Sequence, residues 1–203
     1  MKYYERRRYN ELFEETGNLN VLNGYLQEDY REIRDYRAVV HLLGLLNKKE
    51  EFTVSSVIDI GCGNGLLLKY IRESIGEDII PYGCDYNALA IELLKEQVLS
   101  QFADNFTHED VNQMKRVIDQ DVAIIMHGDY SWNRLSITSP YIILRIRKNL
   151  DDHPMKEAQK QAIIRDTQRL EESKRLSLLQ VRPSTHRHSF RLYENQNNNE
   201  PFY

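Results

Sequence analysis

The sequence has few cysteines and no long apolar run, and both shortages narrow the class of protein. Two cysteines occur in 203 residues, and the first eight residues lack the apolar core of a signal peptide. We therefore expect reduced thiols and a cytoplasmic location. The longest apolar stretch, Ala38 to Leu46, is interrupted by His41. It is far too short to cross a bilayer, so we expect no membrane partner.

The sequence also has no internal repeat and no strong compositional bias. Charged residues make up 29% and apolar residues 41%, which argues against a disordered or fibrous chain. The length suits one domain with its own core. We expect a helical extension over residues 1–50, the main domain over 51–193 and a loose, Asn-rich tail over 194–203.

The net charge of −4 conceals an uneven distribution. Residues 1–140 carry 15 basic and 23 acidic side chains, whereas residues 141–203 carry 12 basic and 8 acidic ones. A basic C-terminal third suits contact with a nucleic acid, but solvated helix faces have the same composition. No Arg/Lys run with interleaved aromatics is found there, so nucleic-acid binding is kept as an alternative.

The first 50 residues carry a helical pattern. Apolar and long side chains recur at spacings of three and four, which predicts a single helical stripe through Leu26, Tyr30, Ile33, Arg37 and Val40. Six of the 13 tyrosines lie in this segment. Either they pack into the core with hydroxyls at its rim, or the segment forms a lid over a ligand pocket.

From residue 54 onward, short apolar runs alternate with amphipathic stretches. This alternation predicts an α/β fold with a mostly parallel sheet covered on both faces. The expected strands are 54–60, 79–85, a short one ending near 109–110, 122–126 and 141–147, and the expected helices are 66–75, 88–98, 111–118 and 156–176. Residues 177–181 and 188–193 flank a turn and read as a closing antiparallel hairpin.

The most informative stretch is Asp59-Ile60-Gly61-Cys62-Gly63-Asn64-Gly65, at the end of the first strand. Glycines there allow a tight turn and close approach of a ligand, and the helix that follows offers free amide donors. A dinucleotide fingerprint would need a glycine where Leu66 stands. The pattern D-x-G-x-G-x-G instead resembles the S-adenosylmethionine (SAM) loop of class I methyltransferases.

A second acidic residue supports this resemblance. Asp85 ends the next strand, where a carboxylate accepts hydrogen bonds from both ribose hydroxyls of a nucleoside. Ligands of open parallel sheets lie across the carboxyl ends of adjacent strands. Asn87 already supplies a helix cap, so we prefer ribose binding to capping for Asp85.

The resemblance covers residues 54–130 and implies a Rossmann-like three-layer sandwich that binds SAM. In the family, the acid at Asp59 holds the glycine loop and the amino-acid end of SAM. Asp110 matches the acid that meets the adenine amino group, and Glu109 takes this role if the register shifts by one. The predicted cofactor site comprises Asp59, Gly61, Cys62, Gly63, Gly65, Asp85, Tyr86, Asp110 and Val111.

The fourth strand end is where such enzymes place catalytic groups. The sulfonium methyl is already activated, so the enzyme has to align a nucleophile and exclude water. A general base helps when the acceptor is a hydroxyl or a protonated amine. His127 or Asp129 would serve as that base, and Tyr130 and Trp132 would wall the acceptor pocket. The alternative for His127 is an ordinary strand-end histidine.

The absence of certain motifs argues against some classes of methyl acceptor. Amino-directed DNA methyltransferases carry N/D-P-P-Y/F where this chain has His127-Gly128-Asp129-Tyr130. Cytosine-C5 methylation needs a cysteine nucleophile. Cys62 lies in the glycine loop and Cys84 lies beside Asp85, so neither is placed to attack a base, and we expect both to be small core residues. No Pro-Gly-Gly turn precedes the fifth strand. A small-molecule acceptor is therefore the leading hypothesis.

Two alternatives remain open. One is a SAM-binding interaction protein without catalysis, and the other is a methyltransferase acting on RNA or protein through the basic C-terminal region. We expect no metal: His186 and His188 share one strand face, but no third ligand is evident nearby.

Overall fold

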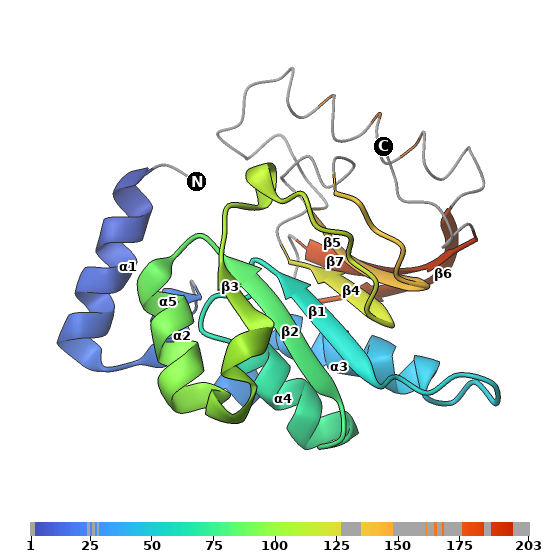
Figure 1. The fold of residues 1–203 in the computed structure, drawn as a ribbon, viewed down its shortest axis with the longest axis horizontal. Helices are drawn as coiled ribbons and strands as arrows, with labels where there is room; N and C mark the ends of the chain where they lie inside the picture. Colours follow the sequence, from blue (N-terminus) through green and yellow to red (C-terminus); the bar gives the residue numbers. More distant parts are fainter. Residues whose placement is uncertain are drawn as a thin grey trace.

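The strands form one mixed sheet (Figure 1). The computed structural model describes residues 3–23, 25, 27, 29–126, 135–147, 161, 165, 168, 176–184 and 188–196. Seven strands lie in the order β3-β2-β1-β4-β5-β7-β6. Strands β1 to β5 are parallel and β7 is antiparallel to both of its neighbours. The predicted α/β fold, with a mostly parallel sheet and a closing hairpin, is confirmed.

The strand positions follow the apolar runs. The strands are β1 (Ser56–Ile60), β2 (Ile80–Asp85), β3 (Phe106–His108), β4 (Val122–Ile125), β5 (Tyr141–Arg147), β6 (Leu176–Pro183) and β7 (His188–Asn195). All four residues of β4 are buried, as expected for a central parallel strand covered on both faces. Strand β7 extends to Asn195, two residues into the range expected to be a loose tail.

The helical segments lie between the strands and before the first of them. They are α1 (Tyr3–Thr16), α2 (Leu19–Leu22), η1 (Tyr30–Glu32), α3 (Arg34–Leu46), α4 (Leu66–Ile75), α5 (Ala88–Leu93), the π-helix η2 (Leu94–Val98), η3 (Ser100–Asn105) and η4 (Val111–Gln113). Helix α4 has the predicted bounds. Asn87 caps α5 as predicted, since its side chain accepts from the Ala90 amide at 3.5 Å.

The core has two parts, one on each face of the sheet. On one face, α3 and α4 pack against alternate strand residues such as Val57 and Ile124. On the other face, Ile58 and Ala123 belong to a second cluster with residues from irregular segments. Because successive strand residues point to opposite faces, central strands such as β1 and β4 contribute to both clusters.

The predicted single helix through residues 26–40 is wrong. Asp29 accepts a hydrogen bond from the Arg31 amide and caps the short 3₁₀ turn η1. Ile33 then adopts an extended backbone (ψ 112°), and α3 begins only at Arg34. Side-chain spacing cannot reveal this break, because Tyr30 and Ile33 still pack against the same core.

The predicted helix over residues 111–118 is also wrong. Only the turn η4 forms, and Ile118 instead makes a parallel bridge with Ile137. The Ile118 amide donates to the Ser136 carbonyl at 2.8 Å, and its own carbonyl accepts from the Thr138 amide at 2.8 Å. Pairing with a distant segment therefore overrides the local helical pattern.

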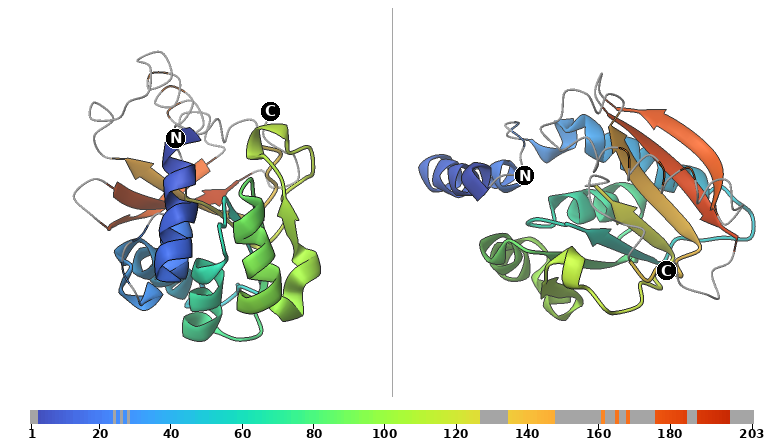
Figure 2. Two further views of the ribbon diagram at one scale, coloured as in Figure 1. Left: turned by 90° about the vertical axis from the view of Figure 1, so that its left-hand side faces the viewer. Right: turned by 90° about the horizontal axis from the view of Figure 1, so that it is seen from above.

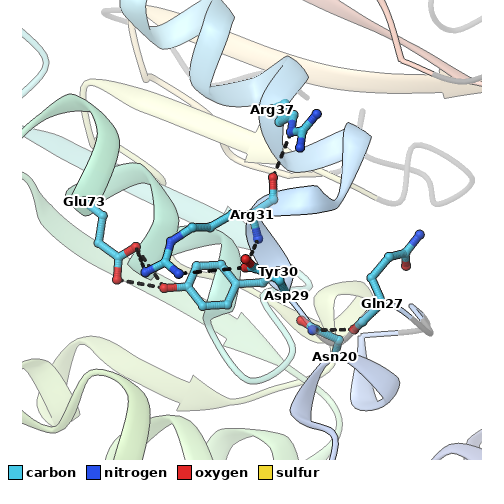
Figure 3. Close-up of polar contacts among 7 residues, drawn as sticks. All are labelled: Asn20, Gln27, Asp29, Tyr30, Arg31, Arg37 and Glu73. Carbon is cyan, nitrogen blue, oxygen red and sulfur yellow. Dashed lines mark hydrogen bonds and ion pairs between the residues drawn. The ribbon is translucent and has the colours of Figure 1, made fainter.

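Two neighbouring residues of the N-terminal extension, Tyr30 and Arg31, contact Glu73 of α4 (Figure 3). The Tyr30 hydroxyl donates to the Glu73 carboxylate, with distances of 2.7 and 2.8 Å to its two oxygens. Arg31 also contacts Glu73, at 3.3 Å, and lies over the Tyr30 ring at 4.9 Å. Partial burial and the Glu73 carboxylate raise the pKa of Tyr30 to about 12, so the phenol remains a donor at neutral pH.

The first helix lies further out. Figure 2 shows α1 projecting from the side of the molecule, away from β6 and β7. Among the described residues, no helix is both long and apolar enough to span a bilayer. Of the predicted helix 156–176, the structure describes Gln161, Arg165 and Gln168, which are helical, and Leu176, which begins β6.

Candidate functional site

The glycine loop joins β1 to α4 at the carboxyl end of the sheet. Its three glycines have positive φ angles of 84°, 54° and 76° at Gly61, Gly63 and Gly65. The amides of Gly61 and Cys62 both donate to the Cys84 carbonyl, at 2.9 and 3.0 Å. The loop is therefore bound to the end of β2, where Asp85 lies.

Two of the predicted loop residues, Gly65 and Cys62, lie in close contact with neighbouring segments of the core. A Cβ on Gly65 would lie 2.7 Å from Leu94 Cδ1, so this glycine allows α4 to approach η2. The Cys62 side chain is buried against Gly83, whose missing Cβ would lie 2.8 Å from Cys62 Sγ. Burial raises the pKa of the Cys62 thiol well above its ordinary value, which leaves the thiol protonated.

Asp85 connects the loop, the second strand and the third strand. Its Oδ2 accepts from the Gly63 amide at 2.9 Å and its Oδ1 accepts from the Asn87 amide at 2.8 Å. Its carbonyl accepts from the Glu109 amide at 2.9 Å. This carboxylate is 7% exposed and lies at the meeting point of the predicted site residues.

Asp59 lies opposite Gly83 of β2 and Ile124 of β4. It is 2% exposed, and its Oδ1 forms no hydrogen bond with any described residue. Burial is the largest cause that raises the pKa of Asp59 to about 8; the charge of Asp85 raises it further, while Arg145 lowers it. An orphaned buried carboxyl oxygen is costly, and a cationic ligand group would satisfy it.

The third-strand residues lie at the same edge of the sheet. His108 pairs with Asp85 in the strand register, and its Nε2 lies 2.9 Å from the Tyr86 carbonyl oxygen. Asp110 follows and is exposed, and Val111 begins η4. Strand β3 ends at His108, slightly before the predicted end near 109–110, and Asp110 follows two residues after the partner of Asp85.

Comparison with solved structures identifies this architecture. Magnesium protoporphyrin IX methyltransferase from Synechocystis PCC 6803, solved with bound S-adenosylhomocysteine (SAH), has a TM-score of 0.59 at 14% identity over 95% of this chain and 100% of its own. The plantazolicin methyltransferase BpumL has a TM-score of 0.52 at 15% identity over 95% of this chain and 96% of its own. An rRNA methylase from Escherichia coli has a TM-score of 0.52 at 17% identity, covering 97% and 78% respectively.

This chain has the class I SAM-dependent methyltransferase fold. The resemblance seen in the D-x-G-x-G-x-G loop is thus confirmed at the level of the fold. No family model and no curated protein sequence matches the chain. At identities this low, the shared feature is the backbone arrangement of the fold.

The methyltransferase fold of this chain carries an N-terminal contact that the sequence did not reveal. Asn23, at the end of α2, donates from Nδ2 to Asn64 Oδ1 at 2.7 Å and accepts at Oδ1 from the Asn64 amide at 3.1 Å. The same Nδ2 donates to the Tyr36 hydroxyl at 2.8 Å. No local sequence signal marks Asn23, because its partner Asn64 is 41 residues away.

A second contact missed by sequence reasoning surrounds Asp35 in the first turn of α3. This buried carboxylate accepts from the Tyr25 hydroxyl at 3.0 Å and from Arg145 Nη1 at 3.1 Å. It also accepts from the Ser184 hydroxyl, after β6. The cluster joins the N-terminal segment to β5 and the closing hairpin, and its arginine lowers the pKa of Asp59.

The predicted catalytic residues His127, Asp129 and Tyr130 lie outside the described residues, as do Trp132 and His186. His188 begins β7. Within the part of the chain that the structure describes, no group of three or more His, Cys, Asp or Glu side chains is placed to hold a metal ion.

Proposed function

We propose that this protein is a SAM-dependent methyltransferase that acts on a small-molecule acceptor. The observation that carries the proposal is a glycine loop next to a buried carboxyl oxygen that has no hydrogen-bond partner among the described residues. The glycine loop is hydrogen-bonded to Asp85, and the buried oxygen of Asp59 beside it has no partner among the described residues. A ligand with ribose hydroxyls and an ammonium group would meet both features.

Every predicted cofactor residue except Gly65, which packs against Leu94, has a direct place in this proposal. Asp85 would hold the ribose hydroxyls, and Asp59 would hold the ammonium of the amino-acid end. The backbone of Gly61, Cys62 and Gly63 would line the close approach. Tyr86, Asp110 and Val111 would surround the adenine, with Asp110 accepting from its amino group. The strand register supports this arrangement, because Asp85 pairs with His108, two residues before Asp110.

Bound SAM would supply an activated methyl group on a positively charged sulfur. The task left to the chain is to hold the acceptor in line with that methyl group and exclude water. We assign the acceptor side to His127, Asp129 and Tyr130, with His127 or Asp129 taking the proton that the acceptor loses. The N-terminal extension, already fixed to α4 through Tyr30, would cover the site as a lid.

The test is a calorimetric titration with SAH on the wild type, Asp85→Ala and Asp78→Ala. Asp78 is exposed and precedes β2, so it is a matched acidic control at the other end of the same strand. We expect micromolar binding by the wild type and by Asp78→Ala. Asp85→Ala should bind about a hundredfold more weakly, since two charge-assisted bonds are lost. Thermal unfolding of each variant checks that the fold is intact.

The acceptor class requires a second measurement. A labelled methyl donor is incubated with the protein and with separate pools of metabolites, RNA and protein, and labelled product is counted in each. Label in the metabolite pool supports the proposal, whereas label in RNA or protein redirects the acceptor. Binding of SAH without transfer to any pool would favour a non-catalytic binding protein. Absence of SAH binding by folded wild type would contradict the proposal as a whole.

A further inference from the structure

Asn23 fills the space that the second glycine of the loop leaves open. Gly63 has a left-handed φ of +54°, and a Cβ at this position would lie only 2.0 Å from Asn23 Oδ1. The absence of a side chain at Gly63 therefore makes room for a residue of the N-terminal extension. The loop is bounded on this side by Asn23.

Both ends of the Asn23 amide are used. Oδ1 accepts from the Asn64 amide at 3.1 Å, while Nδ2 donates to Asn64 Oδ1 at 2.7 Å and to the Tyr36 hydroxyl oxygen at 2.8 Å. An aspartate could not donate, and an apolar residue could do neither. The contact thus fixes Asn64 in the loop and, at the same time, the phenol of Tyr36.

Tyr36, in α3, is the second partner of the Asn23 side-chain amide. The residue is 2% exposed, and because its oxygen accepts from Asn23, its own proton remains to be donated. Among the described residues, no side chain or carbonyl accepts that proton. The Asp59 carboxyl acts on Tyr36 electrostatically, as one of the causes that raise the pKa of this phenol. Asn23 Nδ2 therefore joins this phenol to Asn64 of the glycine loop, and Asp59 Oδ1, just before the loop, also has no partner among the described residues.

We propose that Asn23 is a positioning residue that aims the Tyr36 hydroxyl at the carboxylate of the cofactor's amino-acid end. That end is a zwitterion, so it carries an acceptor for Tyr36 as well as an ammonium for Asp59. The inference rests on the proposed function and adds an amino-acid subsite built from the N-terminal extension. It makes the extension a part of the cofactor site in addition to a cover.

Two ligands separate this role from a general structural one. SAH carries the amino-acid end, whereas 5′-methylthioadenosine has the same nucleoside and thioether without it. Affinities for both are measured calorimetrically on the wild type, Asn23→Ala, Tyr36→Phe and Asn18→Ala. Asn18 caps α2 by accepting from the Asn20 amide at 3.0 Å and does not contact the loop, so its variant loosens the same segment without removing the contact.

We expect Asn23→Ala and Tyr36→Phe to bind SAH about tenfold more weakly, the loss typical of one hydrogen bond to a charged group. Both should bind 5′-methylthioadenosine within about twofold of the wild type. Asn18→Ala should bind both ligands within about twofold. Tyr36→Phe keeps the buried ring, so it carries the test if Asn23→Ala fails to fold.

Other results would overturn the inference. Equal losses for both ligands would mean that Asn23 only supports the loop, and an equal SAH loss in Asn18→Ala would mean that the segment acts through its stability alone. Normal SAH binding in all variants would overturn the inference while leaving the proposed function intact. A wild type that binds neither ligand would overturn both.

Discussion

Two acids at opposite ends of the parallel sheet, the partly exposed Asp121 and the buried Asp59, have opposite hydrogen-bonding environments. At the amino end, Asp121 Oδ2 accepts from the Ser55 amide, the Ser55 hydroxyl and the Ser56 amide at 2.6 to 2.8 Å. At the carboxyl end, Asp59 Oδ1 has no partner among the described residues. Burial alone would raise the pKa of Asp121, but these hydrogen bonds lower it, whereas the pKa of Asp59 rises to about 8.

Along the same pair of strands, β1 and β4, we infer that Asp121 contributes to stability and Asp59 to ligand binding. At the amino end, hydrogen bonds of Asp121 join the start of β1 to the residue before β4. At the carboxyl end, next to the glycine loop, the buried Asp59 carboxyl has an oxygen without a hydrogen bond among the described residues, which is energetically unfavourable. Unsatisfied buried acids persist at sites where a ligand completes them. The following variants should sharpen this difference or remove it.

The largest effect is expected for Asp59→Asn. The folded pKa of about 8 lies above the unfolded value near 3.8, so the folded state binds more protons between these values. Wild-type stability should therefore fall by roughly 3–4 kcal/mol from pH 5 to pH 8 through this group alone. The asparagine variant should lose this slope and be more stable at pH 8, while binding SAH much more weakly.

Denaturant unfolding at pH 5, 6, 7 and 8 measures this effect for both proteins. The comparison between the two ends would be wrong if wild type and Asp59→Asn showed the same pH slope. Retained SAH affinity in the variant would separate Asp59 from the cofactor.

A smaller effect with the opposite sign is expected for Asp121→Ala. Removing the acceptor leaves three donors without their partner, which should cost about 1–2 kcal/mol in the free energy of unfolding at pH 7. Since the pKa of Asp121 is lowered, its contribution is present above the unfolded pKa and disappears as the pH falls through the folded one. SAH affinity should not change. Asp119→Ala, at an exposed neighbouring position, is the matched control.

The smallest effect is expected at Lys49, also at the amino end. Its Nζ donates to the Tyr141 hydroxyl at 2.9 Å and contacts the Glu194 carboxylate at 3.2 Å. Lys49→Met should cost about 0.5 kcal/mol, because the pair is largely exposed, and the cost should shrink at high salt. A large loss of SAH affinity in this variant would show that the amino end is not separate from the site.

Much of the fold was predictable because its signals are local. The β-branched run before Asp59, the glycines after it and the amphipathic pattern of α4 lie within twenty residues of one another, and each specifies its own backbone geometry. Asp85 was found for the same reason, at the end of the next strand. The predicted helices 26–40 and 111–118 failed because Asp29 starts a separate turn and Ile118 pairs with distant Ile137.

The sequence by itself determined the methyltransferase-like loop, the parallel sheet and the acids at or near the ends of β1, β2 and β3. Only the tertiary structure decided that Asn23 lies against Gly63 and that its side-chain amide donates to the Tyr36 hydroxyl. It also decided that Asp59 Oδ1 has no hydrogen-bond partner among the described residues. Strand and turn preferences depend on neighbouring residues in the chain and can therefore be predicted from the order of the residues. The partners of a side chain depend on which distant segments pack together, and the sequence carries no local mark of that packing.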